Sequence, residues 1–334
     1  MAVFIVLTTL VILFLLSQHS LLKMAAHLID KAKDLAVAWP PRPPMNKIDT
    51  HHHFVPKFYA DAIEAAGGDP SGWPTPQWDL DASKNIMSKL GVKTAILSVT
   101  APGACILKGQ ASLDLARKLN LEAAKIRDQH PRQFGFFANL ANILDTESAL
   151  EEIRFAMDEL KADGVTLFTR YGSGNTYLGH ADIEPIWKEL DRRRCIVFVH
   201  PTHPVDTNRV NPKMPQPMID YPHETTRTAY DMLLQGTRSK YPACKVILSH
   251  AGGTLPYLIS RSATPLRKTP NLAAKVRIGT THEQMVKDFR SFHFDLALSS
   301  SPAVLRMAME LIPHEHILYG VSLLPWNHYS TDYH

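Results

Sequence analysis

Short β-rich runs alternate with helical stretches from Lys47 onward, and this alternation constrains the fold more than any other feature of the sequence. Repeated strand-then-helix units predict a parallel sheet with helices outside it. Eight such units over about 250 residues favour an α/β fold of the (β/α)8 type, a TIM-like barrel, with a doubly wound open sheet as the alternative. No G-x-G-x-x-G motif follows the first run, which speaks against a dinucleotide-binding fold. The expected strands are KIDTHH (47–52), TAILSVT (94–100), FGFFANL (134–140), GVTLFT (164–169), CIVFVHP (195–201), CKVILSHAGG (244–253), FHFDLAL (292–298) and HILYG (316–320).

The chain begins with an apolar segment that we do not assign to the barrel. Residues 1–22 are long enough to cross a bilayer as a helix, and they are expected to be a hydrophobic leader or membrane anchor. Lysines follow this segment, so the positive-inside rule places the catalytic domain in the cytoplasm. Residues 23–46 include the Pro-rich AWPPRPPM and are expected to be a linker, and 47–334 to be the catalytic barrel. The alternative to an anchor is an artefactual extension of the reading frame ahead of Met45.

The charge and the histidine content narrow the possible partners. The net charge is only +4, and no run of Lys and Arg marks a nucleic-acid surface, so nucleic acid is excluded as a partner. Seventeen histidines against three cysteines favour imidazole chemistry over a disulfide framework.

Four histidines fall at the carboxyl ends of expected strands, which is where barrel enzymes place their active sites. His51 and His53 are two residues apart on a strand and share one face, while His52 points the other way, toward the helices. Two imidazoles on one face make half of a metal site, and His200 at another strand end supplies a third. His250 opens the sequence HAGG and is interpreted as a general acid/base near the metal, with a metal ligand or a core histidine as alternatives.

Arg227 is a candidate for substrate binding. It follows the fifth expected strand, and a guanidinium suits bidentate recognition of a carboxylate. A surface salt bridge is the alternative for this arginine. The Gly/Pro-rich stretch 67–81, with its two tryptophans, is expected to be an insertion after the first strand, and long loops of this kind are often lids.

The motifs KIDTHHHFVP, VHP, SHAGG and FHFDLALSS resemble the amidohydrolase superfamily. Within it they resemble the aminocarboxymuconate-semialdehyde decarboxylase-related branch, which removes CO₂ without an organic cofactor. AGGDPSGWPTPQW and ILSVTAPG resemble the fungal 6-methylsalicylate decarboxylases of secondary metabolism. The resemblance implies one divalent metal, Zn²⁺ with Mn²⁺ as the alternative, held by His51, His53 and His200. GVTLFTRY contains no lysine, which agrees with a single metal because binuclear relatives carry a bridging lysine there.

The resemblance also implies a reaction, the decarboxylation of a salicylate-type aromatic acid, as in the conversion of 6-methylsalicylate to m-cresol. The metal would bind the phenolic and carboxylate oxygens, and protonation of the carboxyl-bearing carbon would release CO₂. His250 would orient the substrate or shuttle protons, Arg227 would anchor it, and Trp73 would close over the ring, unless Trp73 and Trp78 are core residues. Relatives of this kind are often homodimers. Metal-dependent hydrolysis of a lactone or amide, and a catalytically impaired relic, are the alternative functions.

The resemblance breaks after Gly320. The family pattern there is G-S-D, whose aspartate completes the metal site, but this chain reads YGVSLLPW and Asp332 lies twelve residues further on. We therefore expect a truncated last barrel unit, produced by a retained intron or a misplaced exon boundary, which transcript sequencing would test. With three histidines alone, we expect weak metal affinity and poor turnover.

Overall fold

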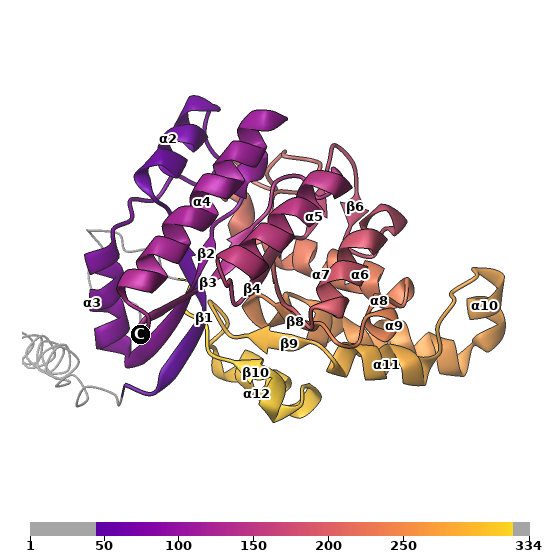
Figure 1. Ribbon diagram of the computed structural model, residues 1–334. Coiled ribbons are helices and arrows are strands. Elements are labelled where there is room, and N and C mark those ends of the chain that lie inside the picture. Colours follow the sequence, from indigo (N-terminus) through magenta and orange to yellow (C-terminus); the bar gives the residue numbers. More distant parts are fainter. Residues whose placement is uncertain (1–44, 323–334) are drawn as a thin grey trace, which may run out of the picture. The chain divides into compact units, whose positions relative to one another are not determined.

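Eight parallel strands form a nearly closed barrel in the computed structural model, which describes residues 45–322 apart from the side chains of residues 272 and 273 (Figure 1). The strands are β1 (Lys47–Phe54), β2 (Val92–Val99), β3 (Phe134–Asn139), β4 (Gly164–Phe168), β7 (Ile196–His200), β8 (Lys245–Leu248), β9 (His293–Asp295) and β10 (Ile317–Leu318). They pair in that order, each parallel to the next. The N–H of Thr50 donates to the carbonyl of Tyr319 at 3.0 Å, which joins the end of β10 to β1. The predicted (β/α)8 barrel is confirmed.

Helices surround the strands, and a short hairpin of β5 (Arg170–Tyr171) and β6 (Thr176–Tyr177) follows β4 (Figure 1). The ends of α3 show how the sequence sets a helix boundary. The Asp79 carboxylate accepts from the N–H of Ala82 at its start, and Gly91 adopts the left-handed conformation, with φ of 71°, at its end. The helices are α2 (Lys57–Ala65), α3 (Leu80–Leu90), α4 (Gln110–Gln129), α5 (Thr146–Arg154), α6 (Glu184–Arg192), α7 (Asp220–Leu234), α8 (Thr237–Lys240), α9 (Leu255–Lys268), α10 (Pro270–Lys275), α11 (His282–Arg290) and α12 (Pro302–Leu311).

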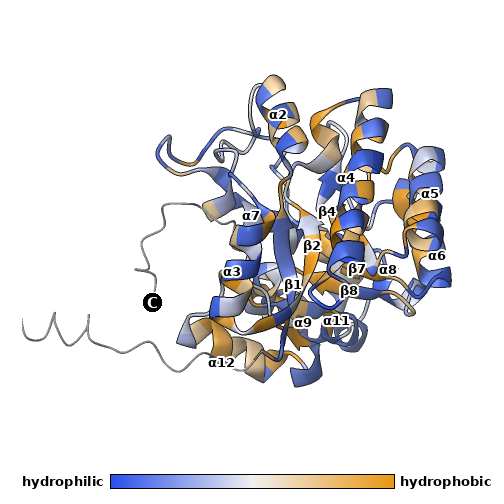
Figure 2. Ribbon diagram, turned by 60° about the vertical axis from the view of Figure 1, so that its left-hand side comes forward, coloured by the Kyte–Doolittle hydropathy of each residue, from blue (hydrophilic) through white to orange (hydrophobic). Residues whose placement is uncertain are grey.

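The core has two parts, as expected when strands alternate between an inner and an outer face. A small cluster of Phe137, Phe198 and Ile247 comes from β3, β7 and β8, and Phe198 pairs in register with Ile247. We assign this cluster to the inside of the barrel, and the larger cluster to the layer between strands and helices. β1 is hydrophilic along most of its length, whereas the central strands beside it are hydrophobic (Figure 2). A polar strand inside a hydrophobic barrel indicates a functional role.

Two sequence predictions fall on residues outside the described range. The expected leader at residues 1–22 and nearly all of the linker lie before Met45, and Asp332 lies after Ser322. None of the helices between residues 45 and 322 is long and apolar enough to cross a membrane.

Candidate metal centre

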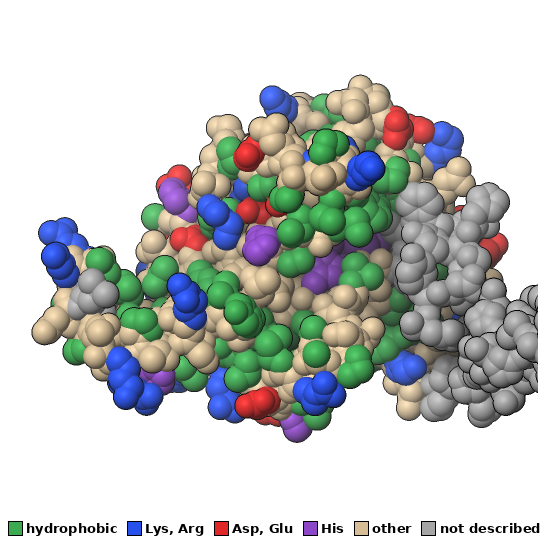
Figure 3. Space-filling model, turned by 180° about the vertical axis from the view of Figure 1, so that it is seen from behind, with side chains coloured by type: hydrophobic (Ala, Val, Ile, Leu, Met, Phe, Trp, Pro, Cys, Tyr) green, Lys and Arg blue, Asp and Glu red, His purple; other side chains and the backbone are tan. Residues whose placement is uncertain are grey.

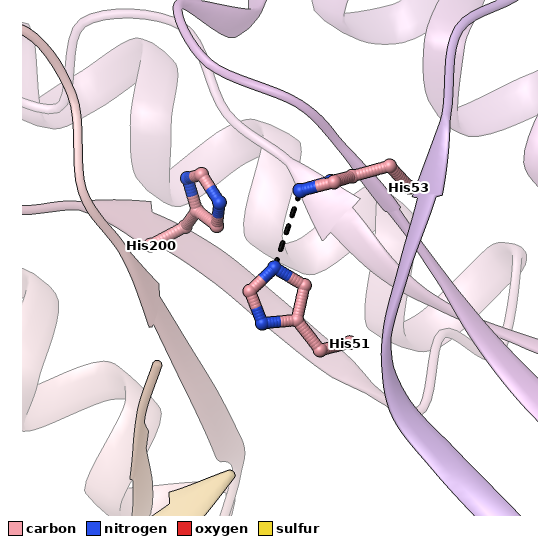
Figure 4. Close-up of side chains that lie close together, drawn as sticks. All are labelled: His51, His53 and His200. Carbon is pink, nitrogen blue, oxygen red and sulfur yellow. Dashed lines mark hydrogen bonds between the residues drawn. The ribbon is translucent and has the colours of Figure 1, made fainter. Parts of the chain in front are cut away.

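Three histidine side chains from two strands converge at the carboxyl end of the barrel (Figure 4). His51 and His53 come from β1 and His200 is the last residue of β7, and one ring nitrogen of each lies within 4.8 Å of the others. All three side chains are buried. The three histidines that were predicted from their positions at strand ends therefore lie together. His200 is about 150 residues from His51 and His53 in the chain. Histidine side chains are visible in a recess bordered by hydrophobic side chains on the face opposite that of Figure 1 (Figure 3).

Hydrogen bonds on the far side of two rings direct their free nitrogens inward. Nδ1 of His51 lies 3.0 Å from a carboxylate oxygen of Asp295, and Nδ1 of His200 lies 2.8 Å from the carbonyl of Pro201. Because these oxygens only accept, each Nδ1 carries the proton and each Nε2 keeps its lone pair. Nε2 of His200 is buried and has no hydrogen-bond partner among residues 45–322, and Nε2 of His51 faces Nε2 of His53 at 3.2 Å.

Burial keeps two of the rings, those of His53 and His200, neutral. Burial, followed by the neighbouring histidines, lowers the pKa of His53 and of His200 well below the ordinary value for histidine. A neutral imidazole is the form that binds metal, and three buried nitrogens with converging lone pairs suit a divalent ion. The donor set therefore fits the single metal that the sequence implied.

His250 lies beside this group but is not one of its three histidines. Its ring centroid is 4.9 Å from that of His51 and 5.7 Å from that of His200. Its Nε2 has no hydrogen-bond partner in the described part of the chain. Burial, followed by His51, lowers the pKa of His250 to about 3. Four consecutive residues, His250 to Gly253, have positive φ values between 54° and 75°. Strained backbone of this kind is concentrated at functional sites, because only the surrounding structure can hold it.

Asp295 is the buried carboxylate that the sequence analysis did not single out. It ends β9, and besides His51 it accepts from the N–H of His250 at 3.2 Å and from that of Ala297 at 2.9 Å. Burial acts to raise its pKa, but His51 and His250 together outweigh burial and hold the pKa below its usual range. The strand-end rule used for the histidines would have found Asp295, since the expected strand FHFDLAL carries it.

Asn139 is a second missed residue at a strand end. It closes β3, its side chain is buried, and its Nδ2 has no hydrogen-bond partner. By alternation from Phe137, its side chain faces the inside of the barrel. In the sequence, Asn139 could have been noticed as the one amide side chain in the otherwise apolar run FGFFANL.

The two predicted substrate-binding residues are not part of the histidine group. Arg227 lies on α7 with its side chain 55% exposed, and its Nε donates to the hydroxyl of Tyr177 and lies 3.7 Å from the Glu224 carboxylate. This contact is the salt-bridge alternative considered for it. Trp73 is half-buried in the loop before α3, and its N–H donates to the Ser71 hydroxyl at 3.3 Å.

The loop that carries Trp73 contacts the long segment that follows the ligand His200. The carbonyl of Ser71 accepts from the N–H of Gln216 at 3.2 Å. Trp78, at the end of the same loop, packs edge-on against Phe54 at 5.3 Å and belongs to the core. The insertion is therefore hydrogen-bonded to the segment that follows β7.

Comparison with known proteins gives a consistent set of relatives. The amidohydrolase family profile matches residues 48–323. A 6-methylsalicylic acid decarboxylase of Penicillium expansum is 51% identical over 277 residues, 83% of this chain and 84% of that protein. The crystal structure of an amidohydrolase II is 31% identical, with a TM-score of 0.74 over 83% of this chain and 87% of the other. A dihydroxybenzoic acid decarboxylase of Polaromonas sp. JS666 with bound manganese is 23% identical, with a TM-score of 0.68 over 84% and 87% of the two chains.

Proposed function

The chain belongs to the amidohydrolase family, and from that premise we propose that it is a metal-dependent decarboxylase of 6-methylsalicylate or a close salicylate-type acid. The observation that carries the proposal is the group of three buried imidazoles, His51, His53 and His200, at the carboxyl end of the barrel. The 51% identity to the Penicillium expansum enzyme supports the choice of substrate.

His51, His53 and His200 would hold one divalent ion. We propose Zn²⁺, because imidazole nitrogens in a small buried group suit it, with Mn²⁺ as the alternative that the Polaromonas structure supports. Bound there, the ion supplies Lewis acidity toward the substrate's phenolic and carboxylate oxygens. Asp295 keeps the ring of His51 in the tautomer that leaves Nε2 free.

His250 is our candidate for moving the proton. The reaction places a proton on the ring carbon that bears the carboxylate, the electron pair of the broken carbon–carbon bond returns to the ring, and CO₂ leaves. The partner-free Nε2 of His250 belongs to a ring next to His51. With a pKa of about 3 its imidazole is neutral at pH 7, but an anionic substrate beside it would raise that pKa and favour the protonated form that donates.

The assignments of Arg227 as carboxylate anchor and Trp73 as lid residue stay predictions. The loop contact between Ser71 and Gln216 supports the second, because it places Trp73 two residues from a bridge between loops at the carboxyl ends of the strands. The pairing of Arg227 with Glu224 favours a structural role for the first.

A metal titration tests the proposed function. The full chain would be stripped of metal, and Zn²⁺ or Mn²⁺ added in steps while release of CO₂ from 6-methylsalicylate is followed. We expect activity to rise with added metal and to saturate, and a His200→Ala variant to show no such rise. Opening of a lactone in place of CO₂ release would support the hydrolase alternative, and failure to bind either metal would support a catalytically impaired relic.

A further inference from the structure

A hydrogen-bonded chain of buried side chains lies behind the metal centre, on the outer face of β1. Nδ1 of His52 is 2.9 Å from the carboxylate of Asp49, and its Nε2 is 3.2 Å from the hydroxyl of Ser83 on α3. All three side chains are buried. His52 is the middle member of the three-histidine run, and the strand period directs it away from the ligands His51 and His53.

Asp49 connects this chain to the ligand His51 through the backbone. One of its carboxylate oxygens accepts from the N–H of His51 at 3.0 Å and from the N–H of Val321 at 3.1 Å, while the other faces His52. The register of β1 against β2 shifts between Asp49 and His52, so Thr50 and His51 together lie opposite one residue of β2, as in a bulge. The Asp49 side chain therefore provides an acceptor where the regular ladder is interrupted.

Hydrogen bonds fix both the backbone and the ring of His51. Its N–H is bonded to Asp49, its carbonyl accepts from the N–H of Ser322 at 2.8 Å, and its Nδ1 is bonded to Asp295. Only Nε2, the nitrogen that faces His53, is left for a metal. The ring is oriented by Asp295, but the position of the backbone that carries the ring depends on Asp49.

We propose that Asp49, His52 and Ser83 are positioning residues for the metal centre: they hold the bulged backbone of His51 in place and couple it to α3. The proposal deepens the function proposed above and rests on the metal site at His51, His53 and His200. A carboxylate with three donors is fixed in one orientation, and His52 supplies the donor that stops Asp49 from rotating toward other partners. Displacement of a ligand backbone by a fraction of an ångström is enough to weaken a metal site.

The test is a comparison of metal affinity, measured by competition between the full chain and a chelator for Zn²⁺ and for Mn²⁺. In His52→Phe, a ring of similar size replaces both nitrogens, and we expect the metal dissociation constant to rise by about 10- to 100-fold. Ser83→Ala removes only the outermost bond, and we expect a smaller rise of about two- to fivefold. Ser83→Ala should add nothing in the His52→Phe background, because the chain is already broken there. At saturating metal, kcat should recover in both variants.

A matched control separates positioning from general stability. His293 begins β9 at the opposite end of the barrel, is half-buried, and stacks on His316 with ring centroids 4.1 Å apart. His293→Phe replaces a histidine with a ring in the same way as His52→Phe, and it should leave metal affinity unchanged.

The outcomes are distinguishable. If the unaltered chain binds neither ion, the proposed function fails. If it binds metal and His52→Phe binds equally well, the positioning role fails alone. Should His52→Phe not fold, Ser83→Ala and Asp49→Asn decide the question, since the isosteric amide loses the fixed carboxylate: unchanged affinity in both overturns the proposal, and weakened affinity supports it.

Discussion

The substitution Asp295→Asn should disable the metal centre although it changes one atom. The Oδ1 atom of Asp295 accepts from two backbone N–H groups, those of His250 and Ala297, which will keep an oxygen at that position. The new amide nitrogen must then face Nδ1 of His51, where the carboxylate now accepts at 3.0 Å. An amide nitrogen can only donate, so His51 has to accept at Nδ1 and carry its proton on Nε2. That proton occupies the position of the metal.

The size of the effect follows from the alternative tautomer. To bind metal, His51 has to return the proton to Nδ1, which leaves two buried donors facing each other. Each buried donor without a partner costs about 1–3 kcal/mol, so the pair costs about 2–6 kcal/mol. At about 1.4 kcal/mol for each factor of ten, metal affinity should fall by at least about 30-fold and by as much as about 10⁴-fold.

The assay is metal competition with a chelator at pH 7.5, run beside the variant Asp191→Asn. Asp191 is a partly buried aspartate whose Oδ1 also accepts from two backbone N–H groups, those of Ala243 and Cys244, and it makes no hydrogen bond to a histidine of the described chain. We expect Asp191→Asn to bind metal like the unaltered protein. The tautomer argument is refuted if Asp295→Asn, shown to be folded, binds metal within threefold of the unaltered chain.

Three further predictions concern pH, the proton and the substrate. The metal-free protein should be less stable at pH 5.5 than at pH 7.5 by urea unfolding, because below about pH 6.5 the unfolded chain takes up protons that buried His53, His200 and His250 do not. An equal loss in the double variant with glutamine at His53 and His200 would contradict this. His250→Gln should lower kcat by about 100-fold or more with metal affinity retained, and an unchanged kcat would remove His250 from proton transfer. If Arg227 anchors the substrate, Arg227→Ala should raise KM by about tenfold or more, whereas its ion pair with Glu224 predicts an unchanged KM.

The barrel could be predicted because each strand carries its own local signal. Runs such as FGFFANL and GVTLFT are short, apolar and bounded by helical stretches, and all eight expected runs contain a strand. The helix α9 was not predicted, because its sequence includes Pro256 and Pro265 and is rich in serine and threonine. Pro256 is tolerated at the start of the helix and Pro265 near its end, which local propensity alone does not reveal.

The grouping of His51, His53 and His200 could be predicted for the same reason. A barrel brings the carboxyl ends of its strands together, and each of these histidines lies at such an end. The supporting residues could not. The partner of His52 is Ser83, 31 residues further on, and the bulge at His51 is a property of pairing between β1 and β2. Neither this contact nor this irregular pairing produces a hydrophobic pattern or a motif that can be recognised in the sequence. Asp295 is different, because its strand end was visible and only its role was missed.

The central claim is that this site removes a carboxyl group as CO₂ and leaves a proton in its place. The most direct measurement is NMR of 6-methylsalicylate labelled with ¹³C at the carboxyl, incubated in D₂O with the metal-loaded full chain. We expect equal amounts of ¹³C-labelled CO₂ and of m-cresol with one deuterium at the carbon between the hydroxyl and methyl positions, and none of either with metal-free protein. Recovery of intact labelled substrate from protein shown to hold one metal ion would contradict it.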